Sequence, residues 1–500
     1  MPPTPARVRF APSPTGLTHL GSARTALYNY LIAQQTKGQF ILRIEDTDQK
    51  RYDPNAEQDL IGNLKWLGLN WEEGPGVGGP YAPYHQSKRM DIYRKHAEEL
   101  VAKGKAFYCF CSTEELDRVR KEQQANKQPP HYSGRCRNLP SEEALQRVKA
   151  GESHVIRFKA PKDGTTTVVD KLRGEITVEN RSIDDRVLLK SDGHAVYHLA
   201  AMVDDRLMVI THVLRSEEWL PSLPLHAHIY EAFGWEQPVW VHLSVFLKPS
   251  GKGKMSKRDT EQMRLTGQSI FVKDLADMGY LPEGVVNWIA LMGWSYDDHT
   301  EFFTMQDLIQ KFDLDKLNPS PAAIDFKKLD HFNGLHIRAL PSKELAKRLL
   351  PYFEKAGIQV DAGQLAPIMP LIQTRMTTLD EGPGLAGFFF KEVNLPPVEM
   401  LVGKGMTAAA SAAALRKATG ILEVLPEFNA ASAEEPMRAV ADELGLKAGQ
   451  LFGILRNVVT GQEISPPLFE SMEIVGREKV LARLQAAIAA LEQNAEQTPD

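Results

Sequence analysis

The first 45 residues carry an order of elements that few folds accommodate: a short strand, a turn rich in proline and glycine, a long helix and a second strand. Val8-Arg-Phe-Ala predicts the first strand, residues 12–16 the turn, and His19 to Gln35 the helix, with Gly38 beyond its end. Phe40-Ile-Leu-Arg-Ile-Glu predicts the second strand. This order is typical of the first unit of a parallel nucleotide-binding sheet, where ligands collect at the carboxyl ends of the strands. An active site is therefore expected near the turn.

The chain is longer than one hydrophobic core usually organises. With about 150 residues per domain as a guide, its 500 residues predict three or four units. Hydrophobic residues make up 43% and charged residues 25%, which argues against disordered, fibrous and membrane classes. The net charge of -5 and the pI near 6.3 provide no global basic field, so any contact with RNA must use local patches. No leader-like segment follows Met1 and no run of about 18 apolar residues occurs, which predicts a cytoplasmic protein.

The pattern changes between about residues 103 and 182. This stretch holds all three cysteines, a charged helix from Thr113 to Gln124 and alternating residues in Thr165-Thr-Thr-Val-Val-Asp, so we expect an inserted module. Val187-Leu-Leu-Lys and Leu207-Met-Val-Ile are expected to be strands that close the main sheet. Beyond about residue 340 the apolar residues follow helical spacing and no strong strand signal remains, which predicts an all-helical end.

Two motifs carry the chemistry. Ala11-Pro-Ser-Pro-Thr-Gly-Leu-Thr-His-Leu-Gly-Ser lies between the first strand and the helix, and its His19-Leu-Gly-Ser fits the "HIGH" pattern of class I aminoacyl-tRNA synthetases. A helix start offers unpaired N–H groups to phosphate, Gly21 lets adenine approach the backbone, and His19 can donate to phosphate oxygens. Lys254-Met-Ser-Lys-Arg, on a loop flanked by Gly251 and Gly253, resembles the "KMSKS" loop of that superfamily. Its lysines, Lys254 and Lys257, can counter the charge that grows on departing pyrophosphate.

Within class I, the chain resembles the bacterial-type glutamyl-tRNA synthetases. The resemblance rests on five segments in the first half of the chain: Arg9-Phe-Ala-Pro-Ser-Pro-Thr-Gly, Arg43-Ile-Glu-Asp-Thr-Asp, Tyr197-His-Leu-Ala, Val203-Asp-Asp and Leu214-Arg-Ser-Glu-Glu-Trp. It implies that the amino acid is surrounded by Arg9, Ala11, Ser13, Glu45, Tyr197 and Arg215, and that ATP lies beside His19, Gly21, Trp219 and Lys257. Two carboxylates and one ammonium on the ligand call for two arginines and one glutamate. Ala201 departs from the relatives, which often carry Asn there, so one polar contact to the substrate is expected to be missing or replaced by water.

The resemblance also implies an organisation and a set of partners. A Rossmann-type catalytic domain would take residues 1–102 and 183–240, an inserted module for the tRNA acceptor end 103–182, the KMSKR loop and a stem-contact domain 241–335, and a helical anticodon-binding domain 336–500. The expected partners are ATP with Mg²⁺, L-glutamate and tRNA(Glu), with tRNA present for activation, and the expected state is a monomer. The carboxylates of Asp46, Asp48, Asp204 and Asp205 cannot be assigned as magnesium ligands from the sequence. Arg375 lies near the position where family members read the anticodon.

The three cysteines leave two interpretations open. Cys109-Phe-Cys111 with Cys136 resembles a zinc site of some relatives, and structural zinc takes four ligands. Asn138 stands where zinc-binding relatives place His, and His131 is another candidate for the fourth ligand. The alternative is three packed or free cysteines.

Several rival functions are compatible with parts of this pattern. Glutaminyl-tRNA synthetases share the catalytic half but carry β-barrels for the anticodon, and the helical end argues against them. A truncated paralogue that modifies a tRNA anticodon base lacks that end, a silent RNA-binding paralogue would not need both ATP motifs, and a small-molecule adenylating enzyme would not need the helical extension. A non-discriminating form that also glutamylates tRNA(Gln) stays open.

Overall fold

The computed structural model describes residues 4–255 and 257–497; the side chains of Lys257, Arg258 and Gln497 lie outside the described set. By its internal contacts the chain divides into two units. Unit 1 comprises Met1–Asp277 and Val285–Leu329, and unit 2 comprises Met278–Gly284 and Asp330–Asp500. Each unit has its own hydrophobic core.

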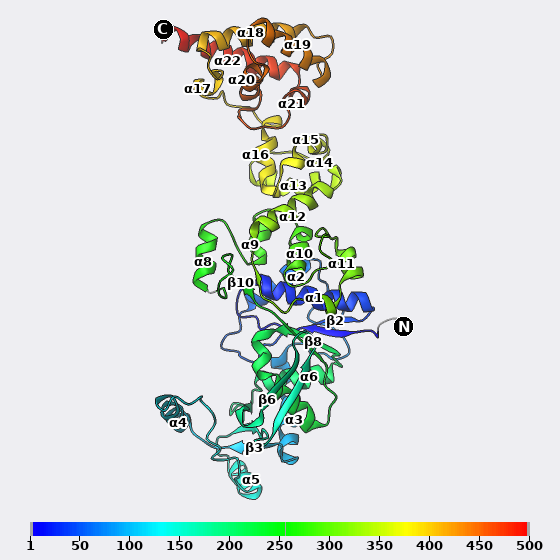
Figure 1. The fold of residues 1–500 in the computed structure, drawn as a ribbon, viewed down its shortest axis with the longest axis vertical. Coiled ribbons are helices and arrows are strands. Elements are labelled where there is room, and N and C mark those ends of the chain that lie inside the picture. Colours follow the sequence, from blue (N-terminus) through cyan, green and yellow to red (C-terminus); the bar gives the residue numbers. More distant parts are fainter. Residues whose placement is uncertain (1–3, 256, 498–500) are drawn as a thin grey trace. The chain divides into compact units, whose positions relative to one another are not determined.

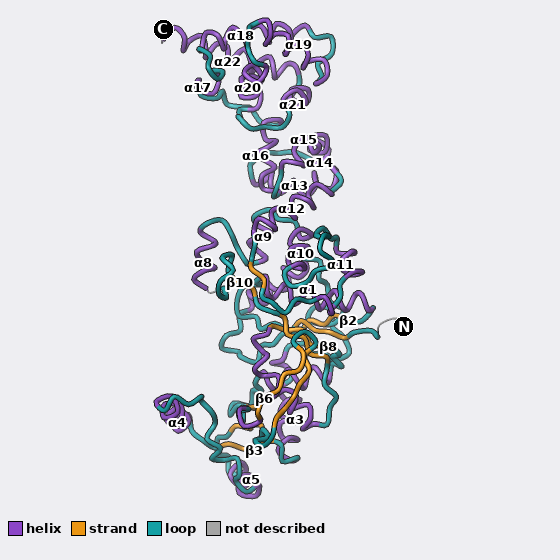
Figure 2. The backbone as a smooth tube through the Cα atoms, viewed as in Figure 1, coloured by secondary structure: helices purple, strands orange, loops and turns teal. Residues whose placement is uncertain are grey.

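A six-stranded sheet organises unit 1 (Figures 1 and 2). In spatial order its strands are β2 (Gln39–Leu42), β1 (Arg7–Phe10), β8 (His212–Ser216), β9 (Val239–Leu243), β5 (Thr165–Asp170) and β6 (Gly174–Glu179). The first five are parallel and β6 returns antiparallel, with Arg9 opposite Ile41 and Arg215 opposite His242. The main helices of this region are α1 (Leu20–Thr36), α2 (Pro54–Trp66), α3 (Met90–Ala102), α6 (Tyr197–Leu207) and α7 (Leu223–Phe233).

The predicted opening is confirmed: β1, α1 and β2 follow one another as the sequence pattern indicates. The end of α1 differs in detail. Lys37 takes the left-handed conformation that closes the helix, with φ of 53°, and donates its N–H back to Gln34. Gly38 is needed for another reason, since a Cβ there would lie 1.9 Å from the carbonyl oxygen of Ala6.

Two expected strands differ from the structure. Leu207-Met-Val-Ile is not a strand: α6 ends at Leu207, Val209 turns the chain with φ of 56°, and β8 starts only at His212. The apolar side chains of Met208 and Ile210 are buried, but the N–H groups of both residues close the end of the helix. Val187-Leu-Leu does form β7 (Val187–Leu189), although in another sheet.

The inserted region contains β3 (Ala106–Cys109), β4 (Val155–Phe158), α4 (Thr113–Ala125) and α5 (Ser141–Lys149). Its two strands form a separate antiparallel sheet with β7, which follows the region in the chain. The hairpin of β5 and β6, which the sequence assigns to the inserted module, instead extends the main sheet through β9. Edge pairing is a tertiary property, and the alternation in 165–179 does not reveal which sheet the hairpin joins.

After the sheet the chain becomes mostly helical. β10 (Phe246–Leu247) pairs with β11 (Ala322–Ala323), and between them lie α8 (Lys257–Leu265), α9 (Val272–Asp277), α10 (Pro282–Leu291) and α11 (Met305–Lys311). α12 (Phe326–Ala339) leads into unit 2, whose longer helices are α13 (Ser342–Lys355), α18 (Ala408–Val424), α19 (Ala430–Glu443), α20 (Ala448–Thr460), α21 (Leu468–Val475) and α22 (Arg477–Gln497). Figure 2 shows only helices and loops in the described part of this unit, which confirms the expected all-helical end. Within the described ranges, no helix has the length and apolar character needed to span a membrane.

Candidate active site

The candidate ligand-binding side chains come from one edge of the main sheet. Arg9 lies on β1, Arg215 on β8 and His242 on β9, while Arg43 directly follows β2. Because these four strands are parallel, their carboxyl ends meet at the same edge. The turn that precedes α1 follows β1 at this edge, so residues far apart in the sequence lie together there.

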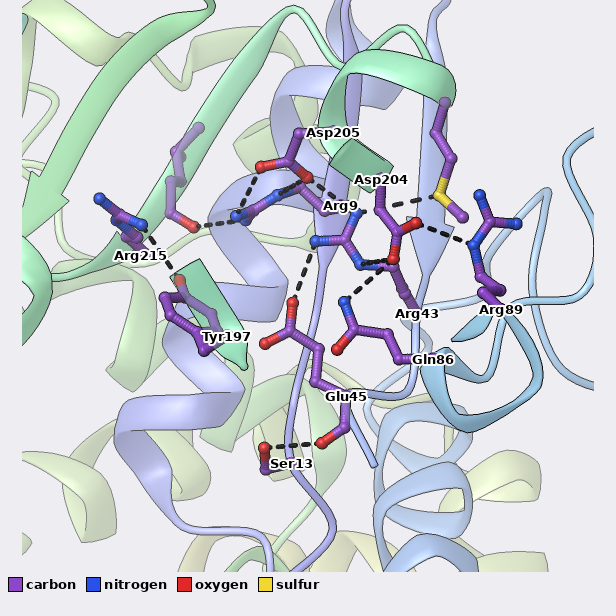
Figure 3. A network of polar contacts seen from close by, with 12 residues as sticks. Arg9, Ser13, Arg43, Glu45, Gln86, Arg89, Tyr197, Asp204, Asp205 and Arg215 are labelled. Atoms are coloured by element: carbon purple, nitrogen blue, oxygen red, sulfur yellow. Dashed lines mark hydrogen bonds and ion pairs between the residues drawn. The ribbon is translucent and has the colours of Figure 1, made fainter. Parts of the chain in front are cut away.

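Two buried aspartates on α6 hold arginines in place (Figure 3). Asp205 accepts from Arg9, Nε to Oδ1 at 3.0 Å and Nη2 to Oδ2 at 3.3 Å, and from Arg43 Nη1 at 2.8 Å. Asp204 accepts from Arg89 Nε at 2.8 Å. Burial acts to raise the pKa of Asp205, but Arg9 and Arg43 hold this pKa below its ordinary value. Asp205 is therefore an anion that fixes two arginines.

The sequence left four carboxylates unassigned as magnesium ligands, and the structure shows what each of them contacts. Asp204 and Asp205 are occupied by arginines. Asp46 accepts from the N–H of Ser87 at 2.8 Å and from its hydroxyl at 2.5 Å, and Asp48 pairs with a neighbouring arginine. Each of the four already has a protein partner.

Three residues assigned to glutamate and one assigned to ATP form two contacting pairs, Ser13 with Glu45 and Tyr197 with Trp219. The Glu45 carboxylate accepts from Arg43 Nη2 at 3.0 Å, and burial raises its pKa although Arg43 acts to lower it. Ser13 Oγ donates to the backbone oxygen of Glu45 at 2.8 Å, which ties the turn after β1 to the segment after β2. The ring of Tyr197 stacks on Trp219 with centroids 3.9 Å apart. The expected amino-acid and ATP sides of the pocket are thus in contact.

Arg215 is buried like Arg9 but is surrounded differently. Its Nη1 donates to Tyr197 Oη at 3.0 Å, its Nε to His242 Nε2 at 2.9 Å, and its Nη2 to His226 Nδ1 at 3.0 Å. Among the residues that the structure describes, Arg215 forms no ion pair with a carboxylate. A buried cation held only by neutral groups favours an anionic ligand.

His19 caps the first turn of α1. Its Nδ1 accepts from the N–H of Gly21 at 3.1 Å and of Ser22 at 3.3 Å, so the proton of the neutral ring is on Nε2. The ring lies against Gly21, where an added Cβ would be 3.1 Å from Cε1 and Nδ1 of His19. The His-x-Gly spacing therefore lets the ring fold over the helix start with Nε2 as a donor, which lies 3.2 Å from Ser22 Oγ in this structure.

The second motif lies on the loop after β10. Gly251 and Gly253 both have positive φ, 72° and 79°, which glycine adopts without strain. Lys254 is exposed and pairs with Glu218. Lys257 begins α8, and its side chain lies outside the described residues.

The three cysteines of the inserted region do converge. All are free thiols, and their sulfur atoms lie within 4.8 Å of one another. Tyr132 Oη lies 3.4 Å from Cys109 Sγ and 3.6 Å from Cys111 Sγ, and accepts from the N–H of Cys136 at 2.9 Å. Two residues were considered as a fourth ligand. His131 Nδ1 instead approaches Asp184 Oδ1 at 3.8 Å, and Asn138 is exposed.

Three further residues complete the comparison with the sequence. Ala11 is half-buried directly after β1, beside the turn, and Ala201 is fully buried on α6. Arg375 ends η6 (Gln373–Arg375) in unit 2 and is exposed.

This fold and this edge of the sheet define the catalytic domain of a class I tRNA synthetase, joined to a helical domain. The sequence matches the family of tRNA synthetases class I (E and Q), catalytic domain, over residues 5–331, and the anticodon binding domain family over residues 344–488.

Two relatives and one solved structure show to which family of tRNA synthetases the chain belongs. The chain is 46% identical over 491 residues to a glutamate–tRNA ligase of Dehalococcoides mccartyi, with 97% of both chains covered. It is 44% identical over 498 residues to one of Roseiflexus sp., again covering 97% of each. A crystal structure of a glutamate tRNA ligase from Elizabethkingia meningosepticum in complex with its amino acid superposes with a TM-score of 0.89 at 36% identity, covering 97% of this chain and 100% of that chain. The chain therefore belongs to the glutamate–tRNA ligases, a family of aminoacyl-tRNA synthetases, as the resemblance predicted.

Sequence reasoning overlooked several members of the site. The pairing of Asp205 with two arginines was not foreseen, although Val203-Asp-Asp was one of the segments that carried the resemblance. His226 and His242 contact Arg215 from α7 and β9, and Tyr132 joins the cysteines. No short motif marks these three, because their partners lie on other elements.

Proposed function

We propose that this site binds ATP and L-glutamate, joins them as glutamyl-adenylate and then transfers glutamate to the 3′ end of tRNA(Glu). The observation that carries the proposal is Arg215: a buried guanidinium with no carboxylate partner among the described residues, at the same edge of the sheet as the helix-capping His19. A carboxylate ligand would compensate the charge of Arg215. The positive end of the α1 dipole and Nε2–H of His19 favour a phosphate group at the start of that helix.

The reaction has two steps. In the first, an oxygen of the α-carboxylate of glutamate attacks the α-phosphorus of ATP, the bond to the bridging oxygen of the β-phosphate breaks, and pyrophosphate leaves with the electron pair. In the second, a ribose hydroxyl of the terminal adenosine attacks the carbonyl carbon and the bond from that carbon to the phosphate oxygen breaks. AMP leaves with the electron pair, and the hydroxyl proton passes to a phosphate oxygen of AMP or to water. No protein nucleophile is needed, so the chain contributes positioning and electrostatic stabilisation.

The roles of the side chains follow from their charge and position. His19 donates through Nε2–H to phosphate oxygens, and Lys254 and Lys257 compensate the charge on pyrophosphate. Arg215 and Arg9 each pair with a carboxylate of glutamate. Glu45 receives the ammonium group.

The other assigned residues define the shape of the binding site. Ala11, Ser13 and Tyr197 border the amino acid, while Trp219 and Gly21 border ATP. Magnesium comes with the triphosphate and neutralises part of its charge. Because Asp46, Asp204 and Asp205 already have protein donors, we assign none of them as its ligand.

Zinc is proposed for the inserted module. Two thiolates held at ~2.3 Å by tetrahedral zinc stand roughly 3.8 Å apart. The sulfur atoms of Cys111 and Cys136 are 3.8 Å apart, which fits such a site. Cys109 is the third thiolate. The fourth ligand would be the oxygen atom Tyr132 Oη rather than a nitrogen of His131.

Metal content provides the test of this site. Protein purified without chelators is expected to hold about one zinc ion per chain, as structural four-ligand sites do. Cys136→Ser is expected to lose it, and Tyr132→Phe to release it faster to a chelator. Release from Tyr132→Phe at the wild-type rate would leave the three thiolates as the only protein ligands and remove Tyr132 from the site. Wild-type protein that stays free of zinc after dialysis against zinc would contradict the site altogether.

The domain roles stay proposals. Residues 103–182 would contact the acceptor end, 241–335 the stem and 336–500 the anticodon, with Arg375 as a candidate anticodon contact. The match of residues 344–488 to an anticodon binding domain supports the anticodon role of residues 336–500. A monomer that acts in the cytoplasm is the further expectation from the sequence.

The deciding experiment is ATP–pyrophosphate exchange with glutamate or glutamine, each with and without tRNA. Exchange with glutamate that requires tRNA is the expected result. Exchange independent of RNA would favour a small-molecule adenylating enzyme, and silence under every condition would favour a paralogue without activity. Charging assays with tRNA(Glu) and tRNA(Gln) then separate the discriminating from the non-discriminating form.

A second prediction concerns selectivity for glutamate. Arg9 keeps one N–H on each terminal nitrogen besides its bonds to Asp205 and the weak contact of Nη1 with Leu214 O at 3.4 Å. Arg9→Leu should reduce the preference for glutamate over glutamine at least about tenfold. In the wild type the NH₂ group of the glutamine amide would leave buried N–H donors of Arg9 without an acceptor, and the variant has no such donors. The measurement is the ratio of kcat/KM for the two amino acids.

Asp205→Asn is the matched control for this test. It breaks the same ion pair and lowers stability, but it keeps the Arg9 cation. A preserved ratio in Asp205→Asn with a reduced ratio in Arg9→Leu would assign selectivity to Arg9. An unchanged ratio in Arg9→Leu would remove Arg9 from the pocket.

A further inference from the structure

The arginines at this edge of the sheet differ in how they are held. Arg9 and Arg43 share the carboxylate of Asp205, and Arg43 also pairs with Glu45, so their charges are compensated within the protein. Arg215 contacts only neutral groups among the described residues: a phenol, two imidazoles and the indole ring of Trp240, whose centroid is 5.1 Å from its Cζ. It is oriented on several sides yet keeps its full charge.

The protonation of the first imidazole follows from its partners. Arginine only donates, so His242 must accept through an unprotonated Nε2. Its proton is then on Nδ1, which donates to Asp170 Oδ2 at 2.7 Å. Asp170 also accepts from the N–H groups of Leu172 and Arg173 at 3.0 and 2.9 Å, so its carboxylate is held in place at the end of β5. Burial lowers the pKa of His242, although Asp170 acts to raise it.

The second imidazole, that of His226 on α7, has its protonation determined by its partners in the same way. His226, fully buried on α7, accepts from Arg215 through Nδ1 and therefore carries its proton on Nε2, which donates to His198 Nδ1 at 2.9 Å. Burial, followed by Arg215 and His198, lowers the pKa of His226 well below its ordinary value. Burial likewise lowers the pKa of His198 to about 4. The rings of His226 and His198 are therefore both neutral near neutral pH.

We propose that His226 and His242 are positioning residues that orient Arg215 toward a carboxylate of glutamate while leaving its charge uncompensated, and that Asp170 sets the tautomer of His242. The inference rests on the proposed role of Arg215. A carboxylate in place of either imidazole would orient the guanidinium equally well but would compete with the ligand for its charge, as Asp205 does for Arg9. Neutral acceptors avoid that competition, so the anion that completes the site is the substrate.

The test uses pairs of variants that differ in whether an acceptor remains. His242→Leu and His226→Leu remove an acceptor and are expected to raise KM for glutamate about ten- to hundredfold, with KM for ATP within about threefold of wild type. His242→Gln and His226→Gln keep an amide oxygen and are expected to recover most of the affinity for glutamate. The readout is ATP–pyrophosphate exchange in the presence of tRNA, with each substrate titrated separately.

His228→Leu is the matched control for stability. His228 lies on the same helix, is also buried, and bonds to Thr166 and Glu231 instead of Arg215. It is expected to lower the melting temperature comparably to His226→Leu without raising KM for glutamate. Should one Leu variant fail to fold, the pair at the other histidine carries the same comparison.

Arg215→Ala distinguishes the role of Arg215 itself from the role of the histidines that orient it. If Arg215→Ala leaves KM for glutamate unchanged, the proposed role of Arg215 fails and this inference with it. If Arg215→Ala raises KM strongly but the Leu variants do not, Arg215 stays in the pocket and the positioning role is overturned. A rise in KM for ATP equal to that for glutamate, or an equal rise in His228→Leu, would also overturn it, because each indicates a general structural loss.

Discussion

Lys257→Ala is expected to slow adenylate formation by about 10²–10³-fold while KM for ATP barely changes. Lys257 begins α8, directly after the loop that carries Lys254. If the loop closes as pyrophosphate separates, the charge of Lys257 acts only in the transition state, so its removal lowers turnover without weakening ground-state binding. A solvated surface lysine would change stability by no more than about 0.5 kcal/mol and leave turnover intact.

Single-turnover adenylate formation at saturating ATP, glutamate and tRNA measures this effect, with a thermal melt to confirm folding. Lys252→Ala is the control, since Lys252 is exposed on the same loop and outside the motif. The loss of a transition-state contact would lower the rate far more than about threefold. A folded Lys257→Ala protein whose rate stays within that range would therefore contradict the assignment of Lys257 to the transition state. The adenylation mechanism would then rest on His19 and its turn.

Asp204→Asn is expected to have the largest effect on stability, with the free energy of unfolding of unit 1 reduced by about 3–5 kcal/mol. Asp204 is fully buried and accepts from Arg89 Nε at 2.8 Å, Gln86 Nε2 at 3.0 Å and Tyr93 Oη at 2.7 Å. The amide removes the charge that compensates a buried guanidinium and places a donor against other donors. Urea unfolding followed by a probe within unit 1 measures the change.

Asp117→Asn provides the comparison for that measurement. Asp117 pairs with Arg120 at 3.2 Å on α4, and both side chains are more than half exposed. Exposed pairs contribute about 0–1 kcal/mol, so this variant should behave almost as wild type. Equal effects of Asp204→Asn and Asp117→Asn would show that the buried network contributes nothing beyond a surface pair.

Much of the catalytic half could be read from local patterns. The first strand, turn, helix and strand are encoded by neighbouring residues, and the glycines of the second motif mark a loop that needs positive φ. The strand expected at Leu207 was wrong because its apolar side chains are buried while its backbone ends a helix. Apolar alternation reports burial, and burial does not distinguish a strand from the end of a helix.

By itself the sequence determined the class of chemistry, the order of the motifs and the helical character of unit 2, since each motif and each helical pattern consists of residues within a few positions of one another. Only the tertiary structure decided that the β5–β6 hairpin joins the main sheet, that Asp205 compensates Arg9, and that two histidines hold Arg215 without neutralising it. These contacts join residues far apart in the chain. Their geometry follows from how strands and helices pack, which no local spacing records.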